Sequence, residues 1–185
     1  MNIPKTNRRQ FLATTATATI VPASVLGRAK IAPSNRLTVG LIGCGGRGTG
    51  VMNSFLSQSD AQVVGVCDPY ETHFRDNKAG RTFGWKPASE MVGRKYKTKP
   101  CSHYTDYREL CARKDLDIII VGTPDHWHAV QTLDALHNGK DVYCEKPVTH
   151  FFAEGQAVYR EVAKRKGVFQ TGSQQRSDAR FKLAV

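Results

Sequence analysis

A lysine that could exchange a proton with a substrate stands in the segment Glu145-Lys146-Pro147, directly after the short apolar run of residues 141–144. If that run is a buried strand, Lys146 comes at its end, where partial burial disfavours the charged ammonium form. Such a lysine can act as a general acid or base on a carbinol or carbonyl group. Pro147 stiffens the turn and has no N–H to satisfy. Lys146 is therefore the candidate catalytic residue, and Glu145 would orient it or hydrogen-bond a ligand.

A glycine-rich turn follows the first apolar run, residues 37–42, and opens a helix-like segment. In its Gly-x-Gly-x-x-Gly pattern, Gly43 permits a tight turn, Gly45 lets the backbone approach a pyrophosphate, and Gly48 allows close packing of helix on strand. The helix start adds free N–H groups and the positive end of the helix dipole. The turn predicts a dinucleotide site with contacts from Gly43, Gly45, Gly46, Arg47 and Gly48.

An acidic residue, Asp68, stands 20 residues after Gly48, at the end of the second apolar run, residues 62–67. A carboxylate at this place accepts hydrogen bonds from the adenosine ribose hydroxyls and repels a 2′-phosphate. The predicted cofactor is therefore NAD, and NADP is less favoured. Arg47 and the basic segment of residues 75–99 would weaken that preference, because they add positive charge.

The loop of residues 122–128 follows a third apolar run, residues 118–121. It should lie at the carboxyl edge of the sheet, where ligands of such folds bind. We expect it to cover the cofactor, with Trp127 or His128 presenting a flat face or a hydrogen bond near the nicotinamide ribose. His126 and His128 could form a metal pair, but two histidines without a third ligand do not predict a metal site. The predicted cofactor contacts of this loop are Thr123, Pro124, Trp127 and His128.

Apolar runs alternate with amphipathic segments at residues 126–138 and 153–166. That alternation is typical of a parallel sheet covered on both faces, and so predicts an α/β, doubly wound Rossmann fold over residues 36–176. Residues 76–104 interrupt the pattern. They are basic and weakly periodic, and we expect mostly a surface excursion there, with a short helix at residues 88–92. Ile118–Val121 then forms the third strand of the sheet.

Charge and composition exclude several other classes of protein. The net charge is +11, but the excess comes from two segments, residues 1–40 and 75–99, and no recognition helix or aromatic platform supports nucleic-acid binding. The chain is 40% hydrophobic, which is globular rather than disordered. Its five cysteines lack a Cys-x-x-Cys pair, so we interpret them as small buried hydrophobes rather than a disulfide framework.

The first 33 residues are interpreted as an export signal and linker. Arg8-Arg9-Gln10-Phe11-Leu12 resembles the twin-arginine (Tat) consensus, and the Ala/Thr-rich run that follows is too short and too polar for a permanent membrane span. A disordered basic tail is the alternative. We therefore expect transit through the Tat translocase and a periplasmic or otherwise exported location. Tat carries folded cargo, which suits a protein that acquires a dinucleotide before export.

Taken together, the motifs resemble the N-terminal Rossmann domain of the Gfo/Idh/MocA family of sugar and inositol oxidoreductases. The resemblance implies that Lys146 is the catalytic lysine, that the glycine turn, Asp68 and the 122–128 loop contact the cofactor with Glu145, and that Gln174 lies near the cofactor or an interdomain seam. Exported relatives are frequent in that family. The segments that carry the resemblance are Leu41–Gly48, Val66–Asp68, Thr123–Ala129, Glu145–Pro147 and Gly172–Arg176.

Members of that family continue into a C-terminal α/β domain that builds the substrate pocket and often the oligomer interface. Residues 177–185 would be the start of that region, and we expect the second domain to be absent from this sequence. The resemblance implies a sugar, sugar-derivative or inositol substrate and a homo-oligomer for the full-length protein. Its activity would be NAD-dependent hydride transfer at a secondary alcohol.

Two other functions remain open at this stage. The chain could be a non-catalytic NAD-binding module, which its short length supports. It could also belong to an exported branch of NAD-dependent glycosidases, which resemble this family and cleave a glycosidic bond by transient oxidation. Retention of Lys146 favours the dehydrogenase over the glycosidase.

Overall fold

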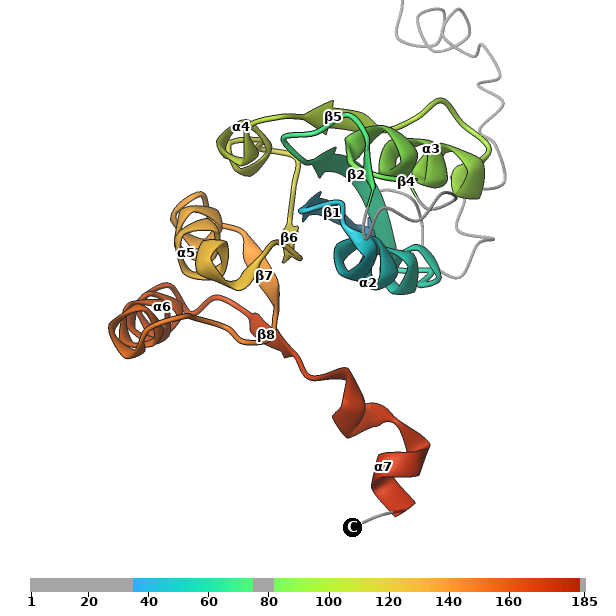
Figure 1. Cartoon of the computed structure of the whole chain (residues 1–185). Helices are drawn as coiled ribbons and strands as arrows, with labels where there is room; N and C mark the ends of the chain where they lie inside the picture. The colour runs from blue at the N-terminus through green and yellow to red at the C-terminus, as the bar shows by residue number, and fades with distance from the viewer. Residues whose placement is uncertain (1–34, 75–81, 184–185) are drawn as a thin grey trace, which may run out of the picture. The chain divides into compact units, whose positions relative to one another are not determined.

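The structure of the chain is a computed structural model that describes residues 35–74 and 82–183 (Figure 1). They form essentially one unit, Arg36–Val185. The predicted export signal, residues 1–33, lies outside the described residues, as does the 75–81 part of the basic segment. Among the residues described, no helix combines the length and the apolar character needed to cross a membrane.

Six strands form one sheet in which every neighbouring pair is parallel. Their spatial order, β5-β2-β1-β6-β7-β8, is the 3-2-1-4-5-6 order of a doubly wound dinucleotide-binding fold (Figure 1). The predicted fold class is confirmed. The strands are β1 Leu37–Ile42, β2 Ala61–Cys67, β5 Ser102–Tyr104, β6 Ile118–Val121, β7 Asp141–Glu145 and β8 Phe169–Gly172.

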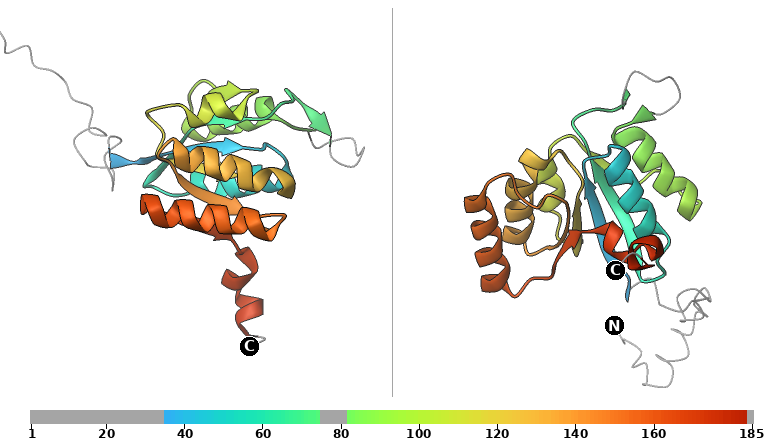
Figure 2. Two further views of the ribbon diagram at one scale, coloured as in Figure 1. Left: turned by 90° about the vertical axis from the view of Figure 1, so that its left-hand side faces the viewer. Right: turned by 60° about the horizontal axis from the view of Figure 1, so that its bottom comes forward.

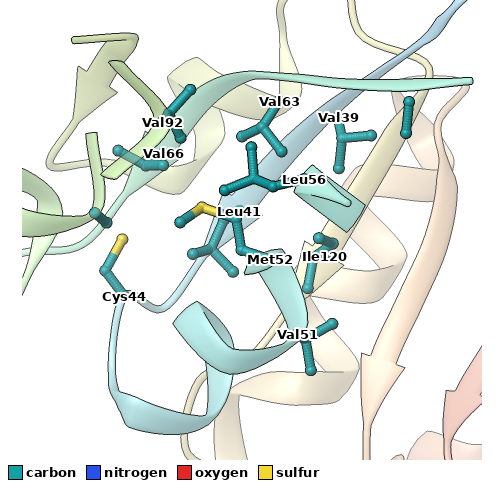
Figure 3. Packing of buried hydrophobic residues seen from close by; sticks show 12 residues of the cluster. Val39, Leu41, Cys44, Val51, Met52, Leu56, Val63, Val66, Val92 and Ile120 are labelled. Atoms are coloured by element: carbon teal, nitrogen blue, oxygen red, sulfur yellow. The ribbon is translucent and has the colours of Figure 1, made fainter. Parts of the chain in front are cut away.

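Helices cover both faces of the sheet, as the right-hand view in Figure 2 shows. On one face, α2 (Gly46–Leu56) and α3 (Trp85–Tyr96) pack on β1 and β2. Figure 3 shows the core between them, in which Leu41 of β1 and Met52 of α2 are both fully buried. The opposite face carries α4 (Tyr107–Cys111), α5 (His128–His137) and, beside α5, α6 (Phe152–Arg165).

Short elements complete the described chain. Two strands of two residues each, β3 (His73–Phe74) and β4 (Thr82–Phe83), form a separate antiparallel pair, the β3–β4 hairpin. In the sequence this hairpin lies between β2 and α3. A 3₁₀ turn, η2 (Asp125–Trp127), precedes α5. A second, η3 (Gln174–Ser177), is followed by α7 (Ala179–Leu183).

The interpretation of residues 76–104 as mostly surface excursion is wrong. Residues 85–96 form the helix α3, which buries Ala88 and Val92 on one face, and residues 102–104 add the strand β5 to the sheet. The stacked rings of Trp85 and His103 join the two elements, with centroids 3.7 Å apart. The helix was underestimated because its polar face dominates its composition, and β5 is too short to show alternation. β6, Ile118–Val121, is therefore the fourth strand of the sheet along the chain, not the third.

Three glycines meet where the strand order reverses, between β1 and β6. A Cβ on Gly48 would lie 1.9 Å from the carbonyl oxygen of Gly43, and one on Gly122 would lie 2.6 Å from the Cα of Gly48. Gly43 also has a φ of +88°, in the left-handed region that favours glycine. The backbones of β1, α2 and the loop after β6 are thus in direct contact, with no room for a side chain.

A matched pair of glycine substitutions in α2 tests this contact. We expect Gly48→Ala to destabilise the chain by roughly 1–3 kcal/mol, because a buried backbone must shift. Gly50→Ala should instead stabilise it by up to about 1 kcal/mol, because Gly50 is exposed, a Cβ there meets nothing within 4 Å, and alanine favours the helix. Urea unfolding measures both free energies. Equal stability of the two variants would contradict the contact.

Candidate functional site

A cleft of about 1070 Å³ opens at the carboxyl edge of the sheet, beside the point of strand reversal. It is slightly above the roughly 300–1,000 Å³ usual for small-molecule sites. Its walls come from the glycine turn, the end of β2, the β3–β4 hairpin, the start of α4 and the loop after β6. Predicted site residues that line it are Gly43, Gly45, Gly46, Arg47, Asp68, Thr123, Pro124 and Trp127.

The glycine turn leaves the N-terminus of α2 open to this cleft. Gly45 is the N-cap, no side chain caps the helix, and the first turn contains no acidic residue. The first N–H groups of a helix have no partner inside the helix, so those of α2 suit an anion. A Cβ on Gly45 would meet no protein atom within 4 Å. Protein packing therefore does not require glycine at this position, whereas close approach of a ligand to the backbone would.

Asp68 is buried and both of its carboxylate oxygens are held by backbone. Oδ2 accepts the N–H of Cys44 at 2.9 Å, and Oδ1 accepts the N–H of Tyr70 at 3.0 Å. Each carboxylate oxygen can accept a second hydrogen bond. Asp68 thus fixes the glycine turn and keeps acceptor capacity on the side of the cleft, which fits a ribose diol.

A second, smaller cavity of about 290 Å³ contains the lysine motif. It is lined by Lys146 and Pro147 and shares Arg47, Gly122 and Thr123 with the larger cleft. The fold therefore brings the predicted catalytic lysine to the same sheet edge as the glycine turn, about a hundred positions earlier in the sequence. Asp125, His128 and Glu145 complete the lining.

An ion pair joins the two motifs. Arg47, in the first turn of α2, donates from Nη2 to Oε1 of Glu145 at 2.6 Å, and Glu145 is buried at the end of β7. The hydrogen bond to Glu145 raises the pKa of Arg47 above its ordinary value. Glu145 Oε2 lies 3.3 Å from the backbone nitrogen of Lys146, which donates to it. Glu145 was expected to hydrogen-bond the cofactor or to orient the lysine, and this backbone hydrogen bond is its contact with the lysine turn.

His128 is buried between two backbone carbonyl groups. Its Nδ1 lies 2.6 Å from the oxygen of Pro147, and its Nε2 lies 2.9 Å from the oxygen of Thr123. The ring therefore ties the loop after β6 to the lysine turn. The expected hydrogen bond from His128 to a cofactor ribose finds both ring nitrogens already engaged. Sequence reasoning missed this positioning role, since nothing in the spacing of residues 128 and 147 indicates the contact.

Lys146 itself is exposed, contrary to the partial burial expected for it. The reason is local: β7 ends at Glu145, so the lysine lies on the turn beyond the sheet edge rather than between sheet and helix. It still lines the smaller cavity, with His128 and Glu145 holding the backbone on either side of it. The polypeptide thus positions this lysine without desolvating it.

Two of the remaining predicted residues, Thr123 and Trp127, contact other side chains of the protein. Thr123 donates its hydroxyl to Gln131 at 2.8 Å, and Trp127 is half-exposed with its ring edge-to-face on Tyr107 at 6.5 Å. Gln174 lies in η3, but its side chain is outside the described part of the structure.

Within residues 35–74 and 82–183, no cluster of three or more His, Cys, Asp or Glu side chains could hold a metal ion.

Several residues that line the larger cleft gave no signal in the sequence. Tyr70, His73 and Phe83 approach it from the chain after β2 and from the hairpin, and Tyr107 and Arg108 from the start of α4.

All five cysteines carry free thiols, and four of them are buried. Burial raises the pKa of each thiol. The four buried ones are small core residues, as expected, and Cys101 is partly exposed.

Comparison with known proteins gives a family match over residues 37–173, to the Gfo/Idh/MocA oxidoreductase family with an NAD-binding Rossmann fold. A glycosyl hydrolase family 109 protein from Shewanella sp. (strain ANA-3) is 31% identical over 69% of this chain and 26% of its own length. An α-N-acetylgalactosaminidase from Shewanella oneidensis is 30% identical over 68% of this chain and 25% of its own. The chain therefore spans about a quarter of the length of these relatives.

Solved structures match the fold at low sequence identity. Scyllo-inositol dehydrogenase from Lactobacillus casei, determined with NAD(H) and scyllo-inositol, has a TM-score of 0.64 at 17% identity, covering 80% of this chain and 39% of that protein. KijD10, a 3-ketoreductase from Actinomadura kijaniata determined with NADP, has a TM-score of 0.63 at 18% identity, covering 81% and 42%. With the family match, the glycine turn and the strand order, these findings show that the chain belongs to the Gfo/Idh/MocA oxidoreductase family and forms its NAD-binding Rossmann domain.

Proposed function

We propose that this chain binds NAD across the two connected cavities and serves as the cofactor domain of an enzyme that oxidises or reduces a secondary alcohol of a sugar, sugar derivative or inositol. One observation carries the proposal. The cleft that contains the glycine turn and Asp68 shares Arg47, Gly122 and Thr123 with the cavity that contains Lys146. A dinucleotide that reaches from the first cavity to the second would bring its reactive ring to the lysine.

Each residue then has a defined task. The N–H groups at the start of α2 bind the pyrophosphate, and Asp68 binds the adenosine ribose. Arg47, paired with Glu145, holds the start of α2 against the end of β7, where the two cavities meet. The nicotinamide ring, when bound, supplies hydride transfer. Lys146 moves a proton to or from the substrate hydroxyl. A bound cationic ring and a substrate would lower the exposure of Lys146 and disfavour its ammonium form.

A second candidate, hydrolysis of a glycosidic bond through transient oxidation, is favoured by the names of the relatives, a family 109 glycosyl hydrolase and an α-N-acetylgalactosaminidase. Both candidates use the same hydride step, and they differ in the net reaction. Incubation of the protein with NAD and either a free polyol or an aryl glycoside separates them. Stoichiometric NADH supports the dehydrogenase, and release of the aryl group without net NADH supports the glycosidase. Binding without either reaction supports the non-catalytic module.

We also propose export through the Tat translocase and a homo-oligomeric full-length protein. The first rests on Arg8-Arg9 in the sequence, and the second on the family resemblance. In a fractionated bacterial culture, the protein should be periplasmic, and an Arg8→Lys/Arg9→Lys variant should remain in the cytoplasm. Equal export of the two forms would contradict the proposal. Light scattering on the full-length protein gives its oligomeric state.

Substitution of the lysine tests its role in the reaction. In a preparation that turns over substrate, Lys146→Ala should lower kcat by roughly 10²–10⁴-fold, the usual contribution of a general acid or base. The dissociation constant for NAD should be unchanged, because the lysine binds no part of the adenosine or pyrophosphate. Lys164→Ala, on the exposed side of α6, is the control and should have full activity. An unchanged kcat in the Lys146 variant would refute the assignment.

Substitution of the acid tests the ribose contact. Asp68→Ala should weaken NAD binding by about 10–100-fold, the loss expected for hydrogen bonds to a charged group. It should also reduce the difference between the dissociation constants for NAD and NADP. Because Asp68 also accepts the N–H groups of Cys44 and Tyr70, the second variant is Asp68→Asn, which has nearly the same shape, lacks the charge and keeps one acceptor oxygen for these N–H groups. If the ratio of the NAD and NADP dissociation constants stays fixed in both variants, Asp68 is not the ribose acceptor.

A further inference from the structure

The cleft beside Asp68 has a second wall, which comes from the end of β5. The backbone N–H of Asp68 donates to the carbonyl of Tyr104 at 3.1 Å, so the ends of β2 and β5 lie side by side. The chain leaves each strand along the cleft: Asp68, Pro69 and Tyr70 on one side, and Thr105, Asp106, Tyr107 and Arg108 on the other. Asp68 and the start of α4 therefore line the same cleft, from two neighbouring strand ends.

The start of α4 contains a closed ion pair, Asp106 with Arg108. Oδ1 of Asp106 accepts the backbone N–H of Arg108 at 2.9 Å, which makes Asp106 the N-cap of the helix. The same carboxylate accepts Nε at 2.9 Å on Oδ1 and Nη2 at 2.8 Å on Oδ2. Such bidentate pairs are among the strongest hydrogen-bonded contacts that arginine makes with a carboxylate. Consistent with it, the pKa of Asp106 is lowered by Arg108, and that of Arg108 is raised by Asp106.

The charges that face this end of the cleft then favour a ribose without a 2′-phosphate. Asp68 is a carboxylate, and the guanidinium of Arg108 is already neutralised by Asp106. Among the described residues that line the cleft, Arg47 is the other arginine, and it is paired with Glu145. An arginine near the ribose is what accommodates the 2′-phosphate in NADP-dependent relatives of this fold. Here Arg108 lines the same cleft as Asp68, and its guanidinium is held by Asp106.

We propose that Asp106 is a second determinant of cofactor specificity, which excludes NADP by keeping the guanidinium of Arg108 from the 2′-phosphate. The inference rests on the proposed NAD site and adds to it a residue with no contact to NAD of its own. In this arrangement Asp68 repels the phosphate, and Asp106 withholds the cation that would compensate. Specificity therefore depends on an intramolecular competition for Arg108 between a carboxylate and a phosphate.

Asp106→Ser tests this competition, because serine preserves the N-cap while removing the charged carboxylate that pairs with Arg108 in bidentate fashion. The pair is exposed and contributes little to stability, so the variant should fold normally. We expect NADP to bind up to about fivefold more tightly than to the unsubstituted chain, because an exposed ion pair is worth at most about 1 kcal/mol, and NAD binding to be unchanged. The gain should shrink as salt is raised. Calorimetric titration with NAD and with NADP measures the four dissociation constants.

Two controls isolate Arg108 as the cause. Adding Arg108→Ala to Asp106→Ser should abolish the gain. Asp115→Ser opens a similar arginine–aspartate pair, Arg113 with Asp115, which lies outside the cleft lining, and should leave both cofactors unaffected. The proposal is overturned if Asp106→Ser leaves NADP binding unchanged, or if the gain persists in the double variant. Failure of NAD to bind the unsubstituted chain would instead overturn the proposed function.

Discussion

The structure depends on one steric constraint, the contact of three glycine backbones where the order of the strands reverses. Gly48 of α2 lies against Gly43 at the end of β1 and against Gly122 at the end of β6, at distances that exclude a Cβ. This contact brings the N-terminus of α2 down onto the sheet edge, between the two strands whose connections run to opposite sides. A crevice at such a reversal is where open α/β sheets bind their ligands.

The position of α2 has a second consequence, because it brings Arg47 within 2.6 Å of Glu145. The glycine turn and the lysine turn are thereby joined by an ion pair whose carboxylate is buried. His128 makes the corresponding link from the loop after β6, through its contacts with Thr123 and Pro147. Lys146 is therefore exposed as a side chain but closely constrained as a backbone position, which suits a group that must meet a ligand from outside the sheet.

Local patterns in the sequence were sufficient for the strands β1, β2, β6 and β7, for the glycine turn, and for the placement of Asp68 and Lys146 at one sheet edge. They were not sufficient for α3 and β5, where a polar helix face and a three-residue strand carry little hydrophobic periodicity. Pairings such as Arg47 with Glu145 join residues 98 positions apart and follow only from the packed fold. The exposure of Lys146 depends on where β7 ends, and strand ends are poorly defined by sequence.

The central claim is that NAD lies across the crevice from Asp68 to the lysine turn. A crystal structure of the NAD complex tests it most directly. We predict that the pyrophosphate contacts the backbone N–H groups at the start of α2, that the adenosine ribose hydroxyls are on Asp68, and that the nicotinamide ring enters the cavity lined by Lys146 and Pro147. A complex in which the nicotinamide lies outside that cavity, or in which the pyrophosphate avoids the glycine turn, would contradict the claim.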